Sequence, residues 1–304
     1  MTNFNNEAYQ VLVKDLIGDI FYSSSSYRSK VSVVRQYAEV VVRRILDIDP
    51  DKKVMLGNDS IQNKLKKLVN ADYLCDAVER VREGGNKTIH TQYREEITSD
   101  EFEQSVDALL DILSFLLINY FEEYKFGSNR EVMSSFSFLP PIIRYKVLNF
   151  LYMKDPQNID VIDKLVLVTM KAFNIDVATQ WVEERKEKLS NLAAFSQGSL
   201  EDITSKLGLS IEELQKKERL PKDLYSLCKL KIQEVGNNLK EKGTLYNDFE
   251  SAYPFYLRGG VLEEKSEDAK KFNDIMKFLF MGRKEDMRQL EEKKGPYLVI
   301  YNID

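Results

Sequence analysis

Apolar residues recur at the period of an α-helix along most of this chain, and this pattern restricts the fold more than any other feature of the sequence. The segment 31–45 carries one apolar stripe at helical spacing, with charged residues on its other positions. The segment 98–121 opens with a capping box, Thr98 and Glu101, and continues as the clearest apolar helix pattern in the chain. Glycine and proline are scarce, at 13 and 7 of 304 residues, which argues against a many-turned all-β chain. The sequence therefore predicts an all-α protein.

The chain divides into two predicted helical lobes. Residues 1–128 predict a helical bundle that ends at turn-forming residues after the 98–121 helix. Residues 129–304 predict a second helical lobe of unknown role, in which short connections indicate antiparallel neighbours. Its tail, 296–301, is the one segment whose composition predicts a strand, although an extended segment packed on helices fits it equally. The segment 199–217 has the rhythm of a helix-turn-helix, but its second helix begins with acidic residues, so we interpret it as a structural connector.

The composition excludes several classes of site. The chain has a single histidine, His90, so sites with two histidine ligands cannot be built within one chain. Its two cysteines lie far apart, which excludes a disulfide framework and a four-cysteine zinc site. The glycine-rich patterns that cradle nucleotide phosphates are absent. We therefore expect neither a metal nor a cofactor.

Charge and hydropathy indicate the cellular compartment of the protein and limit the partners that it can bind. The formal net charge is -5, so any contact with nucleic acid needs a local basic patch. The most apolar stretch, 108–121, is interrupted by Asp111 and is too short to span a bilayer. The N-terminus has no secretory signal pattern, and two lone thiols suit a reducing compartment. We expect a cytoplasmic protein that makes no contact with a membrane.

One short stretch, residues 81–94, gathers the side chains best suited to chemistry. Gly84 and Gly85 predict the end of one helix, and a helix that resumes at Asn86 places four side chains on one face. These side chains are Asn86, His90, Tyr93 and Arg94. An imidazole beside an amide and several cations suits the handling of a phosphodiester, because it combines a proton carrier with an anion clamp. The alternative is structural, with Asn86 capping the new helix and His90 bonding a backbone carbonyl.

The same residues carry a resemblance to a known superfamily. The matching residues are Arg82, Gly85, Asn86 and His90, followed by the long apolar helix that Thr98 caps. This arrangement resembles the HEPN superfamily, and more narrowly the helical domain of unknown function found alone or at the front of type I restriction motor subunits. Arg35 and Glu39 are similar to an arginine and a glutamate on that family's second helix. The resemblance covers residues 1–125 and implies a HEPN-like helical bundle there.

The resemblance also implies a site at a dimer interface. In nuclease members of the superfamily, an arginine and a histidine of two protomers meet and cleave RNA without a metal, with the RNA's own 2′-hydroxyl as the nucleophile. Carried over to this chain, the catalytic residues are Arg82, Asn86 and His90, and the RNA-binding residues are Lys87, Tyr93 and Arg94. At the position where the nuclease members have an arginine, this chain has Gly85, so Arg82 or Arg94 has to supply the missing positive charge.

Two functions follow from these observations. The first is a non-catalytic or degenerate HEPN-like protein of prokaryotic defence, which binds RNA or a protein partner from a restriction or toxin system. The second is a metal-independent HEPN-type endoribonuclease that uses His90 in the site of a homodimer. Because Gly85 stands where the nucleases have an arginine, the sequence favours the non-catalytic function.

Overall fold

The structure is a computed structural model that describes residues 4–89, 92–208, 210, 213 and 221–288. The described residues are mostly helical and contain no strand, which confirms the all-α prediction. The predicted strand at 296–301 lies outside the described residues. The chain forms two compact units, which we call the first and the second unit. The first unit comprises Met1–Tyr124 and Val261–Glu285, and the second comprises Lys125–Gly260 and Asp286–Asp304.

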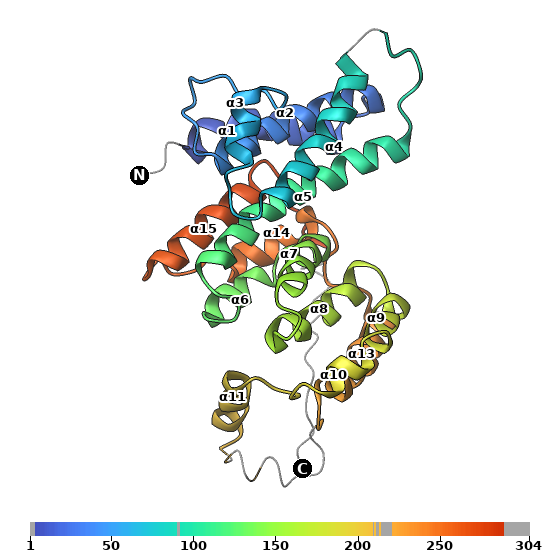
Figure 1. Ribbon diagram of the computed structural model, residues 1–304, viewed down its shortest axis with the longest axis vertical. Helices are drawn as coiled ribbons and strands as arrows, with labels where there is room; N and C mark the ends of the chain where they lie inside the picture. Colours follow the sequence, from blue (N-terminus) through green and yellow to red (C-terminus); the bar gives the residue numbers. More distant parts are fainter. Residues whose placement is uncertain (1–3, 90–91, 209, 211–212, 214–220, 289–304) are drawn as a thin grey trace. The chain divides into compact units, whose positions relative to one another are not determined.

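The first unit is built around α2, α4 and α5, which pack against one another (Figure 1). Its helices are α1 (Asn6–Ile17), the π-helix η1 (Gly18–Tyr22), α2 (Tyr27–Ile45), α3 (Asp59–Leu65), α4 (Ala71–Ile89), α5 (Ser99–Glu123) and α15 (Glu267–Phe280). The predicted capping box begins α5: the backbone N–H of Glu101 donates to Thr98 Oγ1 at 3.2 Å, and that of Thr98 donates to Glu101 Oε2 at 3.1 Å. The two bonds satisfy backbone donors that a helix start otherwise leaves open.

Helix α5 is the core helix of the first unit. Of the described helices, it alone is long and apolar enough to cross a membrane, and 72% of its most apolar window is buried inside the protein. The carboxylate of Asp111, which interrupts its apolar sequence, accepts a hydrogen bond from Tyr73 at 2.9 Å and one from Arg80. These bonds explain how a nearly buried carboxylate is accommodated in this helix, since buried charges need such partners.

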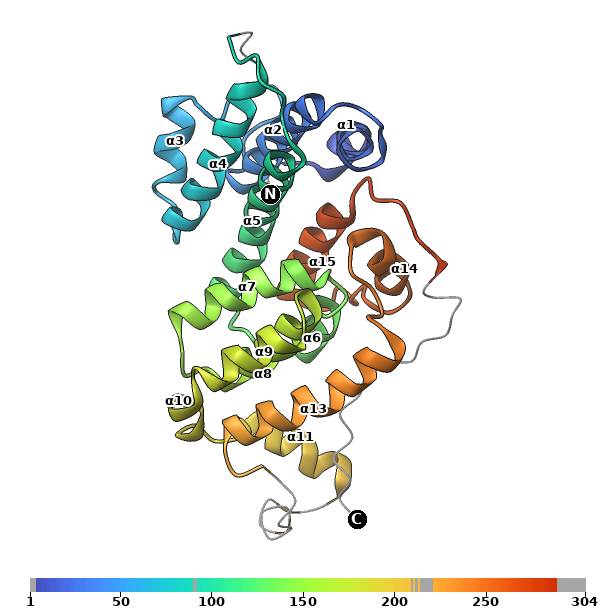
Figure 2. The same ribbon diagram turned by 90° about the vertical axis from the view of Figure 1, so that its right-hand side faces the viewer.

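The first unit includes a segment from far along the chain. Helix α15 packs on α5, and the two lie side by side in both views (Figures 1 and 2). The rings of Phe272 and Tyr120 meet edge to face with centroids 5.1 Å apart, and Phe278 meets Phe4 in the same way at 5.6 Å. The sequence grouped this helix with the second lobe, because the apolar period reveals a helix but not the helix it packs against. The opening segment of the unit ends at Tyr124, four residues before the predicted boundary at 128.

The second unit is also helical. Its helices are α6 (Arg130–Phe136), α7 (Pro141–Lys154), α8 (Ile159–Ala172), α9 (Ile175–Glu183), α10 (Lys186–Ser190), α11 (Gln197–Leu207), α13 (Leu224–Lys242) and α14 (Phe249–Gly259). Helix α8 packs against α7, α9 and α13, and α13 also contacts α9 and α10. Short connections explain the pairing of α8 with α7 and α9, since two helices joined by a few residues fold back on each other, whereas the contacts of α13 join segments far apart in the chain. The second half of the helix-turn-helix pattern lies outside the described residues, apart from Ser210 and Glu213.

The prediction that a helix ends at Gly84 and Gly85 was wrong, because α4 continues through both residues to Ile89. A Cβ atom on Gly84 would lie 2.8 Å from the hydroxyl of Ser105, and one on Gly85 would lie 2.5 Å from Cδ of Arg35. The two glycines therefore allow α5 and α2 to approach α4 closely. A glycine inside a helix costs about 1 kcal/mol relative to alanine, and packing of the apolar face of α4 offsets this cost.

Candidate functional site

Helices α2 and α4 meet along a row of polar side chains, which we call the α2–α4 seam. It consists of Arg28, Ser32, Arg35 and Glu39 on α2 and of Gly85, Asn86 and Thr88 on α4. The hydroxyl of Thr88 donates to the carbonyl of Gly85 at 2.7 Å, and the hydroxyl of Ser32 lies 2.8 Å from the oxygen of Thr88. Because the Thr88 hydrogen is engaged by Gly85, Ser32 is the donor to Thr88.

Asn86, a predicted catalytic residue, is bound from α2. The guanidinium of Arg35 donates to Asn86 Oδ1 at 2.7 Å, and its Nε lies 3.7 Å from the carboxylate of Glu39. The Arg35 side chain is only 14% exposed. Burial raises the pKa of Glu39, and the neighbouring charge of Arg35 opposes that rise. The amide of Asn86 is therefore held by a charge-assisted hydrogen bond, a type that contributes about 1.5–3 kcal/mol.

Arg82, the second predicted catalytic residue, is engaged on its own helix. Its Nε donates to the carboxylate of Glu79 at 2.7 Å, and its terminal nitrogen bonds the other oxygen of the same carboxylate. Its stem lies against the loop before α3, where a Cβ atom on Gly57 would be 3.6 Å from Cδ of Arg82. The two-point contact with Glu79 engages the guanidinium that the sequence predicted to be catalytic.

Lys87 and Tyr93, two of the predicted RNA-binding residues, are held by other protein groups. The ammonium of Lys87 pairs with Glu101 at 2.8 Å, which raises the pKa of Lys87. The phenol of Tyr93 donates to Glu95 at 3.3 Å. Arg28 fixes the loop after α4, because its guanidinium donates to the backbone carbonyls of Lys87 at 3.0 Å, Tyr93 at 3.2 Å and Glu95 at 2.6 Å.

Two of the four side chains that were predicted to share one helical face lie outside α4. Tyr93 and Arg94 follow α4 in the loop of residues 92–98, so the prediction that they continue the face of Asn86 was wrong. Arg94 is exposed there. His90 lies outside the described residues. Arg28 donates to the carbonyls of Tyr93 and Glu95 and so holds the loop that leads to the capped start of α5.

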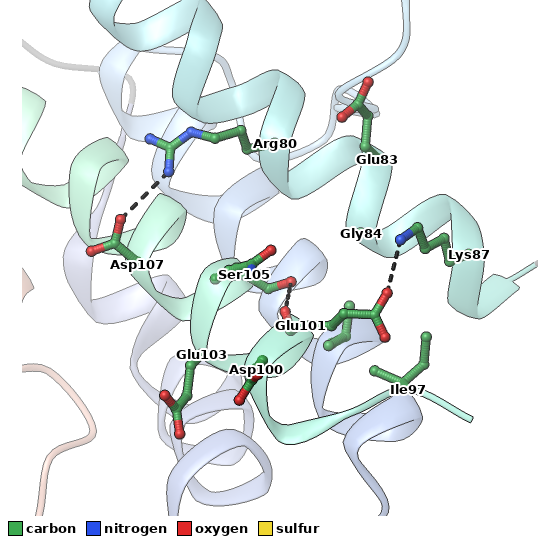
Figure 3. A pocket seen from close by; sticks show the side chains of 12 residues that line it. Arg80, Glu83, Gly84, Lys87, Ile97, Asp100, Glu101, Glu103, Ser105 and Asp107 are labelled. Atoms are coloured by element: carbon green, nitrogen blue, oxygen red, sulfur yellow. Dashed lines mark hydrogen bonds and ion pairs between the residues drawn. The ribbon is translucent and has the colours of Figure 1, made fainter. Parts of the chain in front are cut away.

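A groove runs between α4 and the first turns of α5, on the side of α4 that carries Lys87 (Figure 3). Its volume is about 710 Å³. The charged residues that line it are Arg80, Glu83, Lys87, Asp100, Glu101, Glu103 and Asp107. Figure 3 shows that its two cations are bonded to carboxylates, Lys87 to Glu101 and Arg80 to Asp107. We call this cavity the acidic groove, since its described lining has five carboxylates and two cations.

Two arginines of the seam have a larger role than sequence reasoning assigned to them. Arg28 was not identified, although the spacing of Arg28, Ser32 and Arg35 on one helix face is a detectable signal. Arg35 was noted only as the partner of Glu39, and its bond to Asn86 joins residues 51 positions apart. No local pattern reveals such a contact.

No protein-family model matches this chain, and neither a curated protein nor a solved structure matches it. Within the described ranges, no group of three or more His, Cys, Asp or Glu side chains is placed to hold a metal ion. The chemistry of the seam and of the acidic groove is therefore the basis for a functional assignment.

Proposed function

We propose that this protein is a non-catalytic interaction protein whose first unit binds a basic segment of a protein partner in the acidic groove. One observation carries the proposal: two of the cations expected to meet RNA, Arg82 and Lys87, are each paired with a carboxylate of the protein. Arg35 engages Asn86, Glu79 engages Arg82, and Glu101 engages Lys87. A phosphate at Arg82 or Lys87 would compete with the carboxylates of Glu79 and Glu101, and this competition would reduce the affinity.

The charge of the acidic groove supports a basic partner over RNA. Glu83, Asp100 and Glu103 line it with exposed side chains, and they add negative charge to that of Glu101 and Asp107, the carboxylates that pair with Lys87 and Arg80. Exposed carboxylates attract lysine and arginine side chains and repel phosphates, and they accelerate the encounter with a partner of opposite charge. The net charge of -5 acts in the same direction.

The groove is tested by the binding of a fluorescent lysine- and arginine-rich peptide, measured by anisotropy at low salt. We expect the triple variant Glu83→Gln, Asp100→Asn, Glu103→Gln to bind about tenfold more weakly, because it loses three charge pairs at the surface. The matched control is Glu7→Gln, Asp51→Asn, Asp72→Asn, whose side chains are exposed in the same unit and do not line the groove. Equal weakening in both triple variants, or tighter binding of a single-stranded RNA of matched length, would contradict the proposal.

A second function, the metal-independent endoribonuclease, is favoured by one contact. The Arg35 side chain covers Gly85, the family's arginine place, and its guanidinium binds Asn86. An arginine of α2 thus lies beside position 85, at which the nuclease members of the superfamily carry an arginine. Since Asn86 is the candidate polar residue, this guanidinium is the best candidate in the described chain for the missing charge.

The two functions are separated by incubating the protein with total RNA in the presence of EDTA. Our proposal expects no cleavage by the wild-type protein, because Arg35, Arg82 and Lys87 are each paired with a carboxylate. The endoribonuclease would instead be established if the wild-type protein and Lys188→Met cleave RNA while His90→Ala and Arg35→Gln do not. The homodimer, the defence setting and the cytoplasmic location stay predictions, since they come from the resemblance and the composition.

A further inference from the structure

One ion pair spans the acidic groove. The ammonium of Lys87 on α4 lies 2.8 Å from Oε1 of Glu101 on α5, and Figure 3 shows this side chain reaching across to the carboxylate. The charged part of the described lining otherwise consists of Arg80 and four more carboxylates. The protein thus places one of its own lysines where the proposed function places a lysine or arginine of the partner.

Glu101 can exchange this cation without losing its role at the start of α5. Its Oε2 accepts the backbone N–H of Thr98 at 3.1 Å, whereas its Oε1 binds Lys87. Lys87 and the N–H of Thr98 both lower the pKa of Glu101, so the side chain is ionised near neutral pH. A different cation at Oε1 would therefore leave the capping box intact and restore the charge-assisted hydrogen bond.

Lys87 can also leave Glu101 without losing every counter-ion. Its side chain is 45% exposed, and exposed ion pairs contribute little to stability. Glu83 lies four positions before Lys87 on α4 and lines the same groove. The carboxylate of Glu101, and more weakly that of Glu83, raises the pKa of Lys87. Since a glutamate four positions before a lysine on a helix forms a favourable pair, Glu83 is the second position for the ammonium.

Arg80, the other cation that lines the groove, is held more firmly. Its guanidinium contacts the carboxylate of Asp76 at 3.0 Å and that of Asp107 at 3.5 Å, and it also bonds Asp111. Asp111 is only 7% exposed, so moving Arg80 would remove a cation from a nearly buried carboxylate, which is costly. Of the two described cations, Lys87 is therefore the one that a partner can replace.

We propose that the partner is anchored in the acidic groove by one lysine or arginine that replaces Lys87 at Oε1 of Glu101, while Lys87 turns to Glu83. This inference rests on the function proposed above and adds the position of the anchor and the residue that competes with it. Basic residues next to the anchor face the exposed carboxylates of Asp100 and Glu103. A partner without a cation at the anchor position leaves Lys87 in place and meets its positive charge, so Lys87 determines specificity.

The anchor is tested by titrating the full chain with the same lysine- and arginine-rich peptide, using Lys87→Met and the control Lys64→Met. The control makes the same change of charge, and Lys64 is exposed on α3 of the same unit and does not line the groove. We expect Lys87→Met to bind the peptide about fivefold more tightly than the wild-type protein, because the peptide no longer competes with Lys87. Lys64→Met should stay within about twofold of the wild-type affinity. Equal affinities of the two variants would overturn the inference.

A second substitution, Glu101→Gln, shows whether the peptide contacts Glu101 itself. Glutamine retains the capping box and removes the charge. With Lys87 present, the lost contact with the peptide is offset because no ion pair has to be broken, so the affinity should change by less than about twofold. In the Lys87→Met background the same substitution should weaken binding about fivefold. An equal effect of Glu101→Gln in both backgrounds would refute the replacement of Lys87.

The outcomes separate this inference from the function on which it rests. If the groove's triple variant weakens peptide binding while Lys87→Met and Lys64→Met bind alike, only the inference fails. If the wild-type protein does not bind the peptide, or if both triple variants bind it equally, the proposed function fails and the inference fails with it. We expect the urea midpoints of Lys87→Met and Glu101→Gln to stay near that of the wild-type protein, since neither side chain is buried.

Discussion

We expect the substitution Gly282→Ala to lower the free energy of unfolding of the first unit by about 3 kcal/mol. Gly282 follows α15 with a φ of 75°, in the left-handed region that favours glycine. An added Cβ atom would lie 2.7 Å from the Cα atom of Lys14 and 3.0 Å from its backbone nitrogen. Backbone atoms inside α1 cannot move aside as the end of a side chain can, so the overlap adds to the cost of the left-handed conformation.

The measurement is urea denaturation together with hydrogen exchange resolved along the chain. Exchange should accelerate in α1 and α15 together and stay unchanged in α7 and α8, because Gly282 packs only within the first unit. The control is Gly208→Ala, where φ is 65° and no atom lies within 4 Å of the added Cβ. Its cost should be limited to the conformational part, about 1 kcal/mol. Equal costs at the two positions would show that the packing of Gly282 against α1 is incorrect.

The second large effect is expected at the α2–α4 seam, where Gly85→Ala should destabilise the first unit by about 1–3 kcal/mol. Alanine has the higher helix propensity, so the substitution would stabilise an isolated helix by about 1 kcal/mol. Here the new methyl group would lie 2.5 Å from Cδ and 3.1 Å from Cβ of Arg35. The Cβ atom of Arg35 is fixed to α2, so the helices must separate or the bond from Arg35 to Asn86 must be given up.

Gly18→Ala is the matched control for this effect. Gly18 has helical dihedral angles at the end of α1, in the same unit, and no atom lies within 4 Å of an added Cβ. We expect Gly18→Ala to be neutral or to stabilise the protein by up to about 1 kcal/mol. The two variants are compared by their urea midpoints, and stabilisation by Gly85→Ala would show that α4 and α2 are not in close contact at this point.

Much of the secondary structure could be predicted from local signals. The apolar stripe at 31–45 lies within α2, and the capping box at Thr98 and Glu101 opens α5. Both signals act between residues three or four positions apart, so they can be detected in the sequence without knowledge of the fold. Gly84 and Gly85 were misinterpreted for the same reason, since a local rule attributes paired glycines to a turn.

The position of the candidate site in the chain could be predicted from the sequence, but the contacts between its residues could not. The stretch 81–94 does contain Asn86, which the structure places in a polar contact between two helices. Its partners Arg35 and Arg28 come from another helix, and the ion pairs that occupy Arg82 and Lys87 depend on the side chains that folding brings near them.

The sequence by itself determined that this chain is helical, where its principal helices lie and which of their faces are apolar, because helix periodicity and capping depend on near neighbours in the chain. Only the tertiary structure decided that α15 completes the first unit, that two glycines serve close packing, and which carboxylates pair with Arg82 and Lys87. These outcomes depend on contacts between residues distant in the sequence. Such contacts are selected by shape and charge complementarity over the whole fold.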